Sequence, residues 1–487
     1  MRPFRPLLAL AAVLVALLPG LSQQAAADAG DTLAAPVLEP QGLDQSVCTD
    51  TPLRLTFDQP VRLGKSGQLQ VHHADGTLVD VVDLADQGTY QRSIGGALTD
   101  YGEVHRWYYE PVVLDGATAS IYLHYVLDPG QEYYVTLDEG FFRGQPGITD
   151  QETWRFRTQE GPEPGSSELT VDQAGGADFC TVQGAVDFVP DDNTEDVHIE
   201  VGPGTYREIV YVPQWKPHLT VSGQGAGTTV IGYPNNSVLN GDAAMSDVPA
   251  RQSYCPRRVL PQPDRFNCWR AAFGVDADDF RLADVTIHNT TPDGGSQAEA
   301  FRGNGDQIVL ERVDVLSYQD SLRLQGRAFV TDSYIEGDVD FVWGTGGVFV
   351  QDSELKSLDI GYINQIRNAV DGPGNVFVNT ELTRAEGVPD GSVLLGRIDD
   401  RFLGSQVAFI DTTMDAHIAP VGWGITGADC AEAAEQIRYW EYGSTDPAGN
   451  PVDVSQRLPC SRQLDAAEAE RWRDPATLLD GWDPRQD

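Results

Sequence analysis

Two aspartates, Asp320 and Asp340, have a spacing that suggests chemistry. They lie 20 residues apart, and three short segments around them repeat at the same interval, ERVDVLS from 311, TDSYIEG from 331 and QDSELKS from 351. A period near 20 with strand-like segments between turns is typical of a parallel β-helix. Residues one period apart then lie on neighbouring strands, about 4.8 Å apart. The spacing therefore predicts that the two carboxyl groups are stacked neighbours on one face.

A stacked carboxyl pair can do acid/base work. Two adjacent carboxylates cannot both ionise cheaply, so the pKa of one rises. Gln319 adjoins Asp320, and Gln297 lies 22 residues before Gln319. Amides beside a carboxyl pair are what a site that stabilises an oxyanion requires. The alternative interpretation is that both aspartates are turn residues, which are common between short strands.

Motifs of other hydrolases are missing from the sequence. It has no GxSxG elbow, no HExxH pair, no Walker loop and no Cys/His pattern for zinc. Ester cleavage without a serine can use a carboxylate nucleophile, provided that a second carboxyl group protonates the leaving group. We therefore expect no metal and no cofactor.

Five motifs of this sequence resemble those of the pectin methylesterase (pectinesterase) family. The resemblance runs from about Leu169 to the 440s with the motifs in family order, and it implies a right-handed parallel β-helix. GTYRE (204–208) resembles the family's GxYxE, QAEAF (297–301) its QAVAF, YQDSL (318–322) its YQDTL, GDVDFVWG (337–344) its GTVDFIFG, and LLGR (394–397) its YLGR.

The resemblance also implies a role for each site residue. Asp340 would be the nucleophile and Asp320 the general acid/base, while Arg397 would pair with Asp340 and keep it ionised. Gln297 and Gln319 would donate to the oxyanion. The reaction implied is hydrolysis of the C6 methyl ester of galacturonate units in pectin, through an acyl-enzyme, to methanol and pectate.

Substrate recognition follows less directly from the sequence. Trp343 stands where the family has the second aromatic of DFIF, so it could stack on a sugar or fill the core. Arg302 could meet an acidic sugar or form a salt bridge on the outer face. The chain departs from the family at Ile398 and Asp399, where Pro-Trp is usual. Asp399 cannot stack, and its charge would repel a galacturonate carboxylate.

Three alternatives to pectin de-esterification stay open. The same scaffold could cleave another ester, because the stacking Trp is absent. A polysaccharide lyase would also use a β-helix, but with calcium and a basic residue. A non-catalytic polysaccharide-binding solenoid would not need the set of acidic, amide and arginine residues described above.

Composition and charge limit the partners. The 487 residues include 73 acidic and 33 basic side chains, a formal charge of −40. Nucleic acid, which needs basic patches, is therefore excluded as a partner. The charge is also awkward for an enzyme of pectin, since de-esterified pectin is a polyanion. We attribute most of it to a solvated acidic surface, and we expect a monomer that binds pectin.

The chain divides by composition into four parts. Residues 1–27 resemble a secretory signal, with two arginines before twelve apolar residues, too few to span a membrane. Alternating strand patterns over 28–159 resemble a bacterial immunoglobulin-like β-sandwich, 160–168 is a linker, and 169–487 is the β-helix. We expect a secreted protein, extracellular or periplasmic.

Six cysteines suit an oxidising compartment. Fifteen pairings are formally open. Sequence proximity favours Cys255 with Cys268 and Cys430 with Cys460, and Cys48 with Cys180 would then join the first domain to the second.

Overall fold

The computed structural model describes residues 34–86, 90–98, 104–236, 270–433 and 436–485. The expected signal segment and the Cys255–Cys268 pairing lie outside these ranges. Within them, no helix has the length and apolar character needed to cross a membrane.

The first strands of the chain form small, mostly antiparallel sheets around a core of their own. Leu53, Leu69, Tyr133, Trp154 and Phe156 of this core are fully buried. In the described residues one sheet has the order β1 (Val37–Glu39), β3 (Leu53–Thr56), β9 (Thr118–Ile121), β8 (Val112–Asp115). A second sheet has the order β2 (Gly42–Val47), β11 (Arg155–Thr158), β10 (Glu132–Leu137), β4 (Gln68–His73), β5 (Leu78–Asp83), and β6 (Arg92–Leu98) pairs with β7 (Val104–Tyr109).

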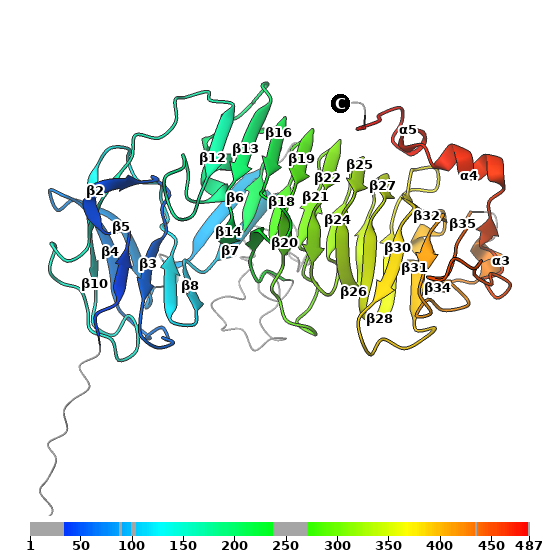
Figure 1. The fold of residues 1–487 in the computed structure, drawn as a ribbon, viewed down its shortest axis with the longest axis horizontal. Helices are drawn as coiled ribbons and strands as arrows, with labels where there is room; N and C mark the ends of the chain where they lie inside the picture. The colour runs from blue at the N-terminus through cyan, green and yellow to red at the C-terminus, as the bar shows by residue number, and fades with distance from the viewer. Residues whose placement is uncertain (1–33, 87–89, 99–103, 237–269, 434–435, 486–487) are drawn as a thin grey trace, which may run out of the picture. The chain divides into compact units, whose positions relative to one another are not determined.

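From residue 168 onward the chain is a parallel β-helix, as the period predicted (Figure 1). Each coil adds one strand to a parallel sheet that has 11 strands in the described residues. Its members are β12 (Glu168–Val171), β13 (Val197–Val201), β16 (Leu219–Ser222), β19 (Phe280–Ala283), β22 (Ile308–Glu311), β25 (Ala328–Thr331), β27 (Val348–Gln351), β29 (Asn375–Val378), β32 (Gln406–Ile410), β35 (Arg438–Tyr442) and β36 (Arg462–Gln463).

A second parallel sheet contains two rows of strands. The first row holds β14 (Gly204–Tyr206), β17 (Thr229–Gly232), β20 (Thr286–His288), β23 (Asp314–Leu316), β30 (Glu381–Arg384) and β33 (Thr413–Met414). The second row holds β15 (Val210–Val212), β18 (Phe273–Val275), β21 (Phe301–Gly303), β24 (Leu322–Leu324), β31 (Val393–Asp399) and β34 (Trp423–Thr426). Two long strands, β26 (Tyr334–Gly344) and β28 (Glu354–Ile366), take part in both rows.

Inward side chains of successive coils stack into one apolar core. Phe377 and Phe409, on adjacent strands β29 and β32, are fully buried with ring centroids 4.5 Å apart and nearly parallel rings. Parallel strands in register place equivalent residues one above another, so aromatic side chains of adjacent coils can stack.

Helices cover the first coil and one outer face. Helix α2 (Val182–Phe188) begins after Thr181, whose side chain accepts from the Gly184 nitrogen at 3.0 Å, and its buried face packs on the first coils. Near the C-terminus, α4 (Ala466–Trp472) and α5 (Pro475–Leu478) pack Ala469 and Leu478 in one cluster with Phe329 and Phe349 of the 11-stranded sheet.

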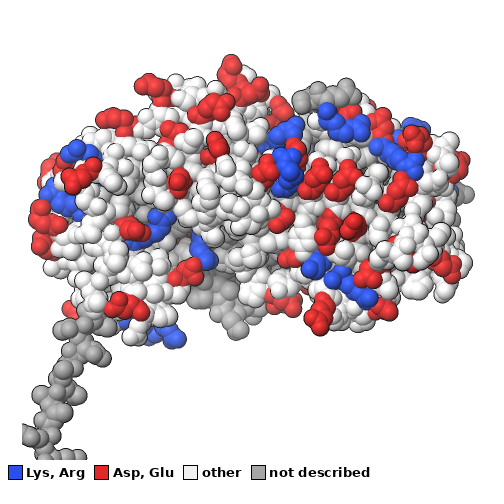
Figure 2. Space-filling model, viewed as in Figure 1, with Lys and Arg blue, Asp and Glu red and all other residues white. Residues whose placement is uncertain are grey.

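Acidic side chains are spread over the surface. Figure 2 shows them scattered across the visible face, with basic side chains in fewer groups. This distribution fits a solvated acidic surface, and it makes any local excess of arginine informative.

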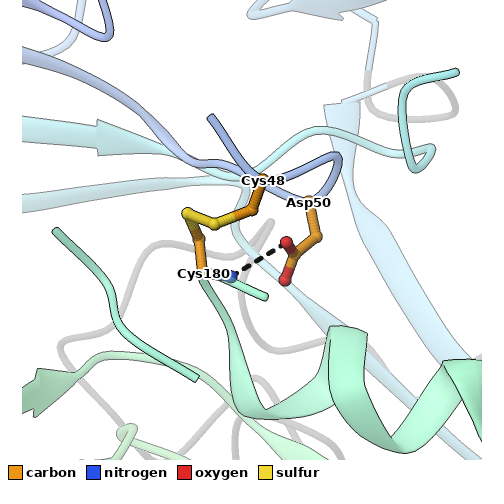
Figure 3. A group of neighbouring side chains, drawn as sticks. All are labelled: Cys48, Asp50 and Cys180. Carbon is orange, nitrogen blue, oxygen red and sulfur yellow. Dashed lines mark hydrogen bonds between the residues drawn. A yellow bond between two sulfur atoms is a disulfide. The ribbon is translucent and has the colours of Figure 1, made fainter. Parts of the chain in front are cut away.

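Two of the expected disulfides are present, and Figure 3 shows the one between Cys48 and Cys180. Cys430, the first residue of α3 (Cys430–Ala433), pairs with Cys460. Cys48 pairs with Cys180 across 132 residues. Beside the latter, the Asp50 carboxylate accepts from the backbone nitrogens of Cys180 at 2.9 Å and Thr181 at 2.8 Å. Burial raises the pKa of Asp50, while these hydrogen bonds lower it. The strand region before the linker is therefore tied covalently to the cap of the β-helix.

Candidate active site

Asp320 and Asp340 lie at equivalent positions of adjacent coils. Leu322 of β24 pairs with Val342 of β26, and the Asp320 nitrogen donates to the Val339 carbonyl at 3.1 Å. The prediction that they are stacked neighbours is confirmed. Both are at the corner between the two rows of the second sheet, where the pairing of β26 is interrupted by register shifts.

Both aspartates have left-handed backbone conformations. Their φ angles are 65° for Asp320 and 54° for Asp340. Aspartate adopts this conformation more readily than most residues, but it still costs energy, and such strain together with β-bulges is concentrated at functional sites.

Asp340 is bound by Arg397 of β31. Arg397 Nε donates to Oδ1 at 2.9 Å and Nη2 to Oδ2 at 2.5 Å, so both carboxylate oxygens are engaged. The Asp340 hydrogen bonds raise the pKa of Arg397. A bidentate guanidinium favours the ionised carboxylate.

Asp320 is in a different environment. Arg270 Nη2 donates to Asp320 Oδ2 at 2.6 Å, and Arg270 Nε donates to Glu299 Oε1 at 3.1 Å. Glu299 is fully buried and also contacts Arg302. The pKa of Asp320 is raised to about 7, chiefly by burial; Arg270 lowers it, while Glu299 and Asp340 add to the rise. The two aspartates are thus in different surroundings: a bidentate guanidinium for Asp340, and burial beside Glu299 and Arg270 for Asp320.

Gln297 and Gln319 lie on neighbouring coils next to the pair. The Ala298 nitrogen donates to the Gln319 carbonyl at 3.0 Å, and the Gln297 side-chain oxygen accepts from Ser296 Oγ at 3.0 Å. Within the described part of the chain neither side-chain nitrogen donates a hydrogen bond, so both amides can donate to a ligand.

Trp343 is enclosed by arginines. Its side chain is 9% exposed, and the guanidinium carbons of Arg270, Arg323 and Arg367 lie 5.2, 4.7 and 5.1 Å from the indole centroid. Cations over an indole face are favourable. Arg302, the other predicted substrate contact, is held by Glu299 at 3.5 Å and pairs in register with Arg323.

Ile398 and Asp399, which stand where the family has Pro-Trp, have separate structural roles. Ile398 points into the core, 1% exposed. Asp399 binds Arg401 through both oxygens, at 3.0 and 2.8 Å, and begins the short 3-10 helix η3 (Asp400–Phe402). Arg401 lowers the pKa of Asp399 and balances its charge. The expected repulsion of a galacturonate is therefore offset, although no aromatic ring stands here.

Four residues of the site were not identified from the sequence: Arg270, Glu299, Arg323 and Arg367. Arg270, Glu299 and Asp320 are separated by 29 and 21 residues, so Arg270 and Glu299 do not follow the 20-residue step. Arg323 does follow it, 20 residues before Trp343 and in register with it. One signal was available, because Glu299 lies within the motif QAEAF and Arg323 directly follows the motif YQDSL.

Two groups in the described residues have side chains placed as metal ligands could be, and neither contains Asp320 or Asp340. One is Cys48, Asp50 and Cys180, whose sulfurs form the disulfide. The other is the surface group Asp196, His218 and Asp279.

Comparisons with known proteins agree with the geometry. A family model described as Pectinesterase matches residues 168–248 and 262–476. Pectinesterase 31 of Arabidopsis thaliana is 32% identical over 304 residues, 62% of this chain and 89% of that protein. Probable pectinesterase 8 of the same plant is 28% identical over 323 residues, 62% of this chain and 72% of that protein.

Solved structures show the same fold. Pectin methylesterase from carrot matches with a TM-score of 0.54 and 23% identity over 66% of this chain and 95% of that one. PemA from Erwinia chrysanthemi matches with a TM-score of 0.51 and 22% identity over 65% and 98%. With a family model matching more than half of its residues, this chain belongs to the pectinesterase family.

Proposed function

We propose that this pectinesterase cleaves C6 methyl esters of galacturonate units in pectin, with Asp340 as the nucleophile. An Asp340 oxygen attacks the ester carbonyl carbon, and the carbonyl oxygen becomes an oxyanion. The amides of Gln297 and Gln319 donate hydrogen bonds to it. As the bond to the methoxy group breaks, Asp320 gives its proton to the leaving oxygen and methanol departs.

The second half of the reaction releases the acid. The first half leaves the substrate carbonyl joined to Asp340 as an anhydride, with Asp320 ionised. Asp320 takes a proton from water, whose oxygen attacks the substrate carbonyl carbon. The bond to Asp340 breaks, which restores the Asp340 carboxylate and the protonated Asp320 and yields a galacturonate carboxyl group.

The unequal environment of the two aspartates is the observation that carries this proposal. Asp340 accepts two hydrogen bonds from Arg397, whereas Asp320 is buried and has its pKa raised to about 7. A nucleophile must be ionised and a general acid must hold its proton, so this asymmetry assigns one role to each residue.

The test is methanol release from methylated pectin by the purified full chain, with absorbance of unsaturated sugars followed in parallel. Methanol without unsaturation supports an esterase. Unsaturated sugar without methanol would indicate a lyase, and binding without either product would indicate a non-catalytic solenoid. Release from other methyl esters but not from pectin would transfer the mechanism to another substrate.

The remaining parts of the chain have proposed roles outside catalysis. We propose that residues 28–159 form an immunoglobulin-like domain, 160–168 a linker and 169–487 the catalytic domain, and that 1–27 direct export. Support comes from the separate core of the first strands and from the disulfides, which suit an oxidising compartment. The protein would act as a monomer, on pectin outside the cell or in the periplasm.

A further inference from the structure

Glu299 is a fully buried carboxylate beside the aspartate pair, two residues before β21. It belongs to QAEAF, and the motif QAVAF that this segment resembles has a valine in its place. A buried carboxylate is unfavourable unless it is paired and hydrogen-bonded, so its presence requires counter-charges. Arg270 Nε donates to Glu299 Oε1 at 3.1 Å, and Arg302 Nη1 donates to Oε2 at 3.5 Å. Both oxygens of Glu299 are thus bound by arginine.

Arg270 is fixed on three sides. Besides the bond to Glu299, its Nη2 donates to Asp320 Oδ2 at 2.6 Å, and its guanidinium carbon lies 5.2 Å from the indole centroid of Trp343. A planar guanidinium that is bound at its edge by carboxyl groups and at its face by an indole has little freedom to turn. Glu299 therefore helps to determine where the group that binds Asp320 lies.

The hydrogen bond from Arg270 also distinguishes the two oxygens of Asp320. A neutral carboxyl group has one carbonyl oxygen, which accepts, and one hydroxyl, which donates. Because Oδ2 accepts from Arg270, the proton of neutral Asp320 belongs on Oδ1. Without this contact the proton could occupy either oxygen, and only one of them can face the leaving group.

Glu299 also changes the charge that Asp320 experiences. Burial has the largest effect on the pKa of Asp320 and raises it, whereas Arg270 lowers it and Glu299 raises it. A guanidinium without a second carboxylate would favour ionised Asp320 more strongly. Pairing with Glu299 keeps the hydrogen bond of Arg270 and offsets its charge. The charged groups that face Asp320 within the described residues are Arg270, Glu299, Asp340, Arg367 and Arg397.

We propose that Glu299 is a positioning residue for the acid step: it fixes Arg270, and Arg270 holds Asp320 with Oδ1 as the oxygen that bears the proton. This inference rests on the proposed function, in which Asp320 gives its proton to the methoxy oxygen. Glu299 acts through Arg270 and not on the ester itself. With an apolar residue at this position Asp320 would lose its proton at lower pH, so Glu299 extends catalysis towards neutral pH.

Two substitutions separate the charge of Glu299 from its hydrogen bond. Glu299→Gln keeps an oxygen that can accept from Arg270 but removes the charge. Methanol release should then keep its kcat within a few-fold below about pH 5, while the fall of kcat/KM with rising pH moves down by about one pH unit. Glu299→Val removes both, so kcat should also drop by roughly 10-fold at every pH with little change in KM. Urea unfolding shows whether each variant is folded.

Infrared difference titration follows Asp320 without turnover. Each protein is compared with the same protein carrying Asp320→Asn, so that the band of the protonated carboxyl group belongs to Asp320. The midpoint should lie near pH 7 in the wild type, lower in Glu299→Gln and higher in Arg270→Gln. The double variant should lie between the two, because opposite charges are removed together. A merely structural role would not move the midpoint in opposite directions.

Glu441→Gln is the matched control. Glu441 of β35 is also buried, and Arg457 donates to its two oxygens at 2.7 and 3.1 Å. This variant should lose stability while the Asp320 midpoint and the pH profile stay in place.

The titration and the turnover assay distinguish the two claims. An unchanged Asp320 midpoint in folded Glu299→Gln would overturn the role of Glu299 even if the wild type releases methanol, and the same result decides the matter if Glu299→Val does not fold. Opposite shifts in Glu299→Gln and Arg270→Gln, with no methanol from the wild type, would uphold the control of Asp320 by Glu299 and overturn the proposed esterase.

Discussion

Arg397 holds Asp340 by both carboxylate oxygens, and it is itself fixed by Tyr362. The Arg397 guanidinium carbon lies 4.3 Å from the Tyr362 ring centroid, while Nε and Nη2 reach Oδ1 and Oδ2 of Asp340. A guanidinium stacked on a ring has little freedom to turn, so the geometry of the carboxylate is fixed before substrate binds.

The first prediction follows from this geometry. Arg397→Lys keeps a positive charge but loses the two parallel hydrogen bonds and the stacking. We expect kcat for methanol release to fall by about 10²-fold, the cost of misplacing a reacting group by an ångström. The matched control is Arg312→Lys, since Arg312 also binds both oxygens of an aspartate, Asp284, at 2.7 and 2.8 Å far from the site. Equal loss in both variants would contradict a specific role for Arg397.

A second prediction concerns the oxyanion donors. Gln319→Ala should reduce kcat by about 10²–10³-fold with a smaller change in KM, because the hydrogen bond strengthens as charge develops. Steady-state methanol release provides both constants. Gln351→Ala, which removes the amide at the end of β27 that donates to Asp352, serves as the control. A loss confined to KM would indicate a substrate-binding residue instead.

The third prediction is a pH dependence. The pKa of Asp320 is raised to about 7, so kcat/KM should fall as pH rises through about 7, when the general acid loses its proton. Arg270 lowers this pKa, so Arg270→Gln should move the fall to higher pH. Arg281→Gln should leave the profile in place. If kcat/KM of Arg270→Gln falls at the same pH as in the wild type, or at a lower pH, Asp320 is not the general acid.

The raised pKa of Asp320 also predicts how the stability of the fold changes with pH. Because the folded pKa lies above the ordinary value of 3.8, folding favours the protonated carboxyl group. The contribution of the protonated Asp320 carboxyl group to the free energy of unfolding is complete below about pH 4 and is lost as pH rises through about 7. Asp320→Asn, which cannot ionise, should therefore show a smaller decline in urea midpoint between pH 5 and pH 8 than the wild type.

The sequence predicts those parts of the β-helix in which successive coils have the same length. Ile308, Ala328 and Val348 follow one another on neighbouring strands at 20-residue steps, so the coils that carry the aspartates could be read from the sequence. The next steps, from Val348 to Asn375 and then to Val407, are 27 and 32 residues. Insertions at the turns hide the period there, and only motif resemblance placed Arg397.

Side-chain contacts between residues several coils apart could not be predicted from the sequence either, because they do not follow the 20-residue period. Arg270 lies three residues before β18 and donates to Asp320 and Glu299. The step from β18 to the next strand of its row, Phe273 to Phe301, is 28 residues. Which carboxylates Arg270 binds depends on the length and direction of its side chain, and not on its spacing in the sequence. Asp399 shows the same limit, because its charge is balanced by Arg401 only through a local turn.

A further prediction separates the two regions of the chain. A chain starting at Ser166 with Cys180→Ser should keep methanol release on short soluble pectin within a few-fold, since every site residue follows the linker. It should unfold at lower urea, because the Cys48–Cys180 link and the Asp50 hydrogen bonds to Cys180 and Thr181 are gone. The control is the full chain with Cys48→Ser and Cys180→Ser. A folded truncated protein without activity would contradict this division.

Asp340 as the nucleophile is the central claim, and methanol release by Asp340→Asn tests it most directly. Asparagine keeps the shape of the side chain, so circular dichroism and urea unfolding should show a folded protein. Activity should be abolished, and adding Asp320→Asn should hardly change the result, because groups acting as one unit are not additive. Asp320→Asn alone should lose about 10²–10⁴-fold. Methanol release near the wild-type rate by folded Asp340→Asn would contradict the mechanism.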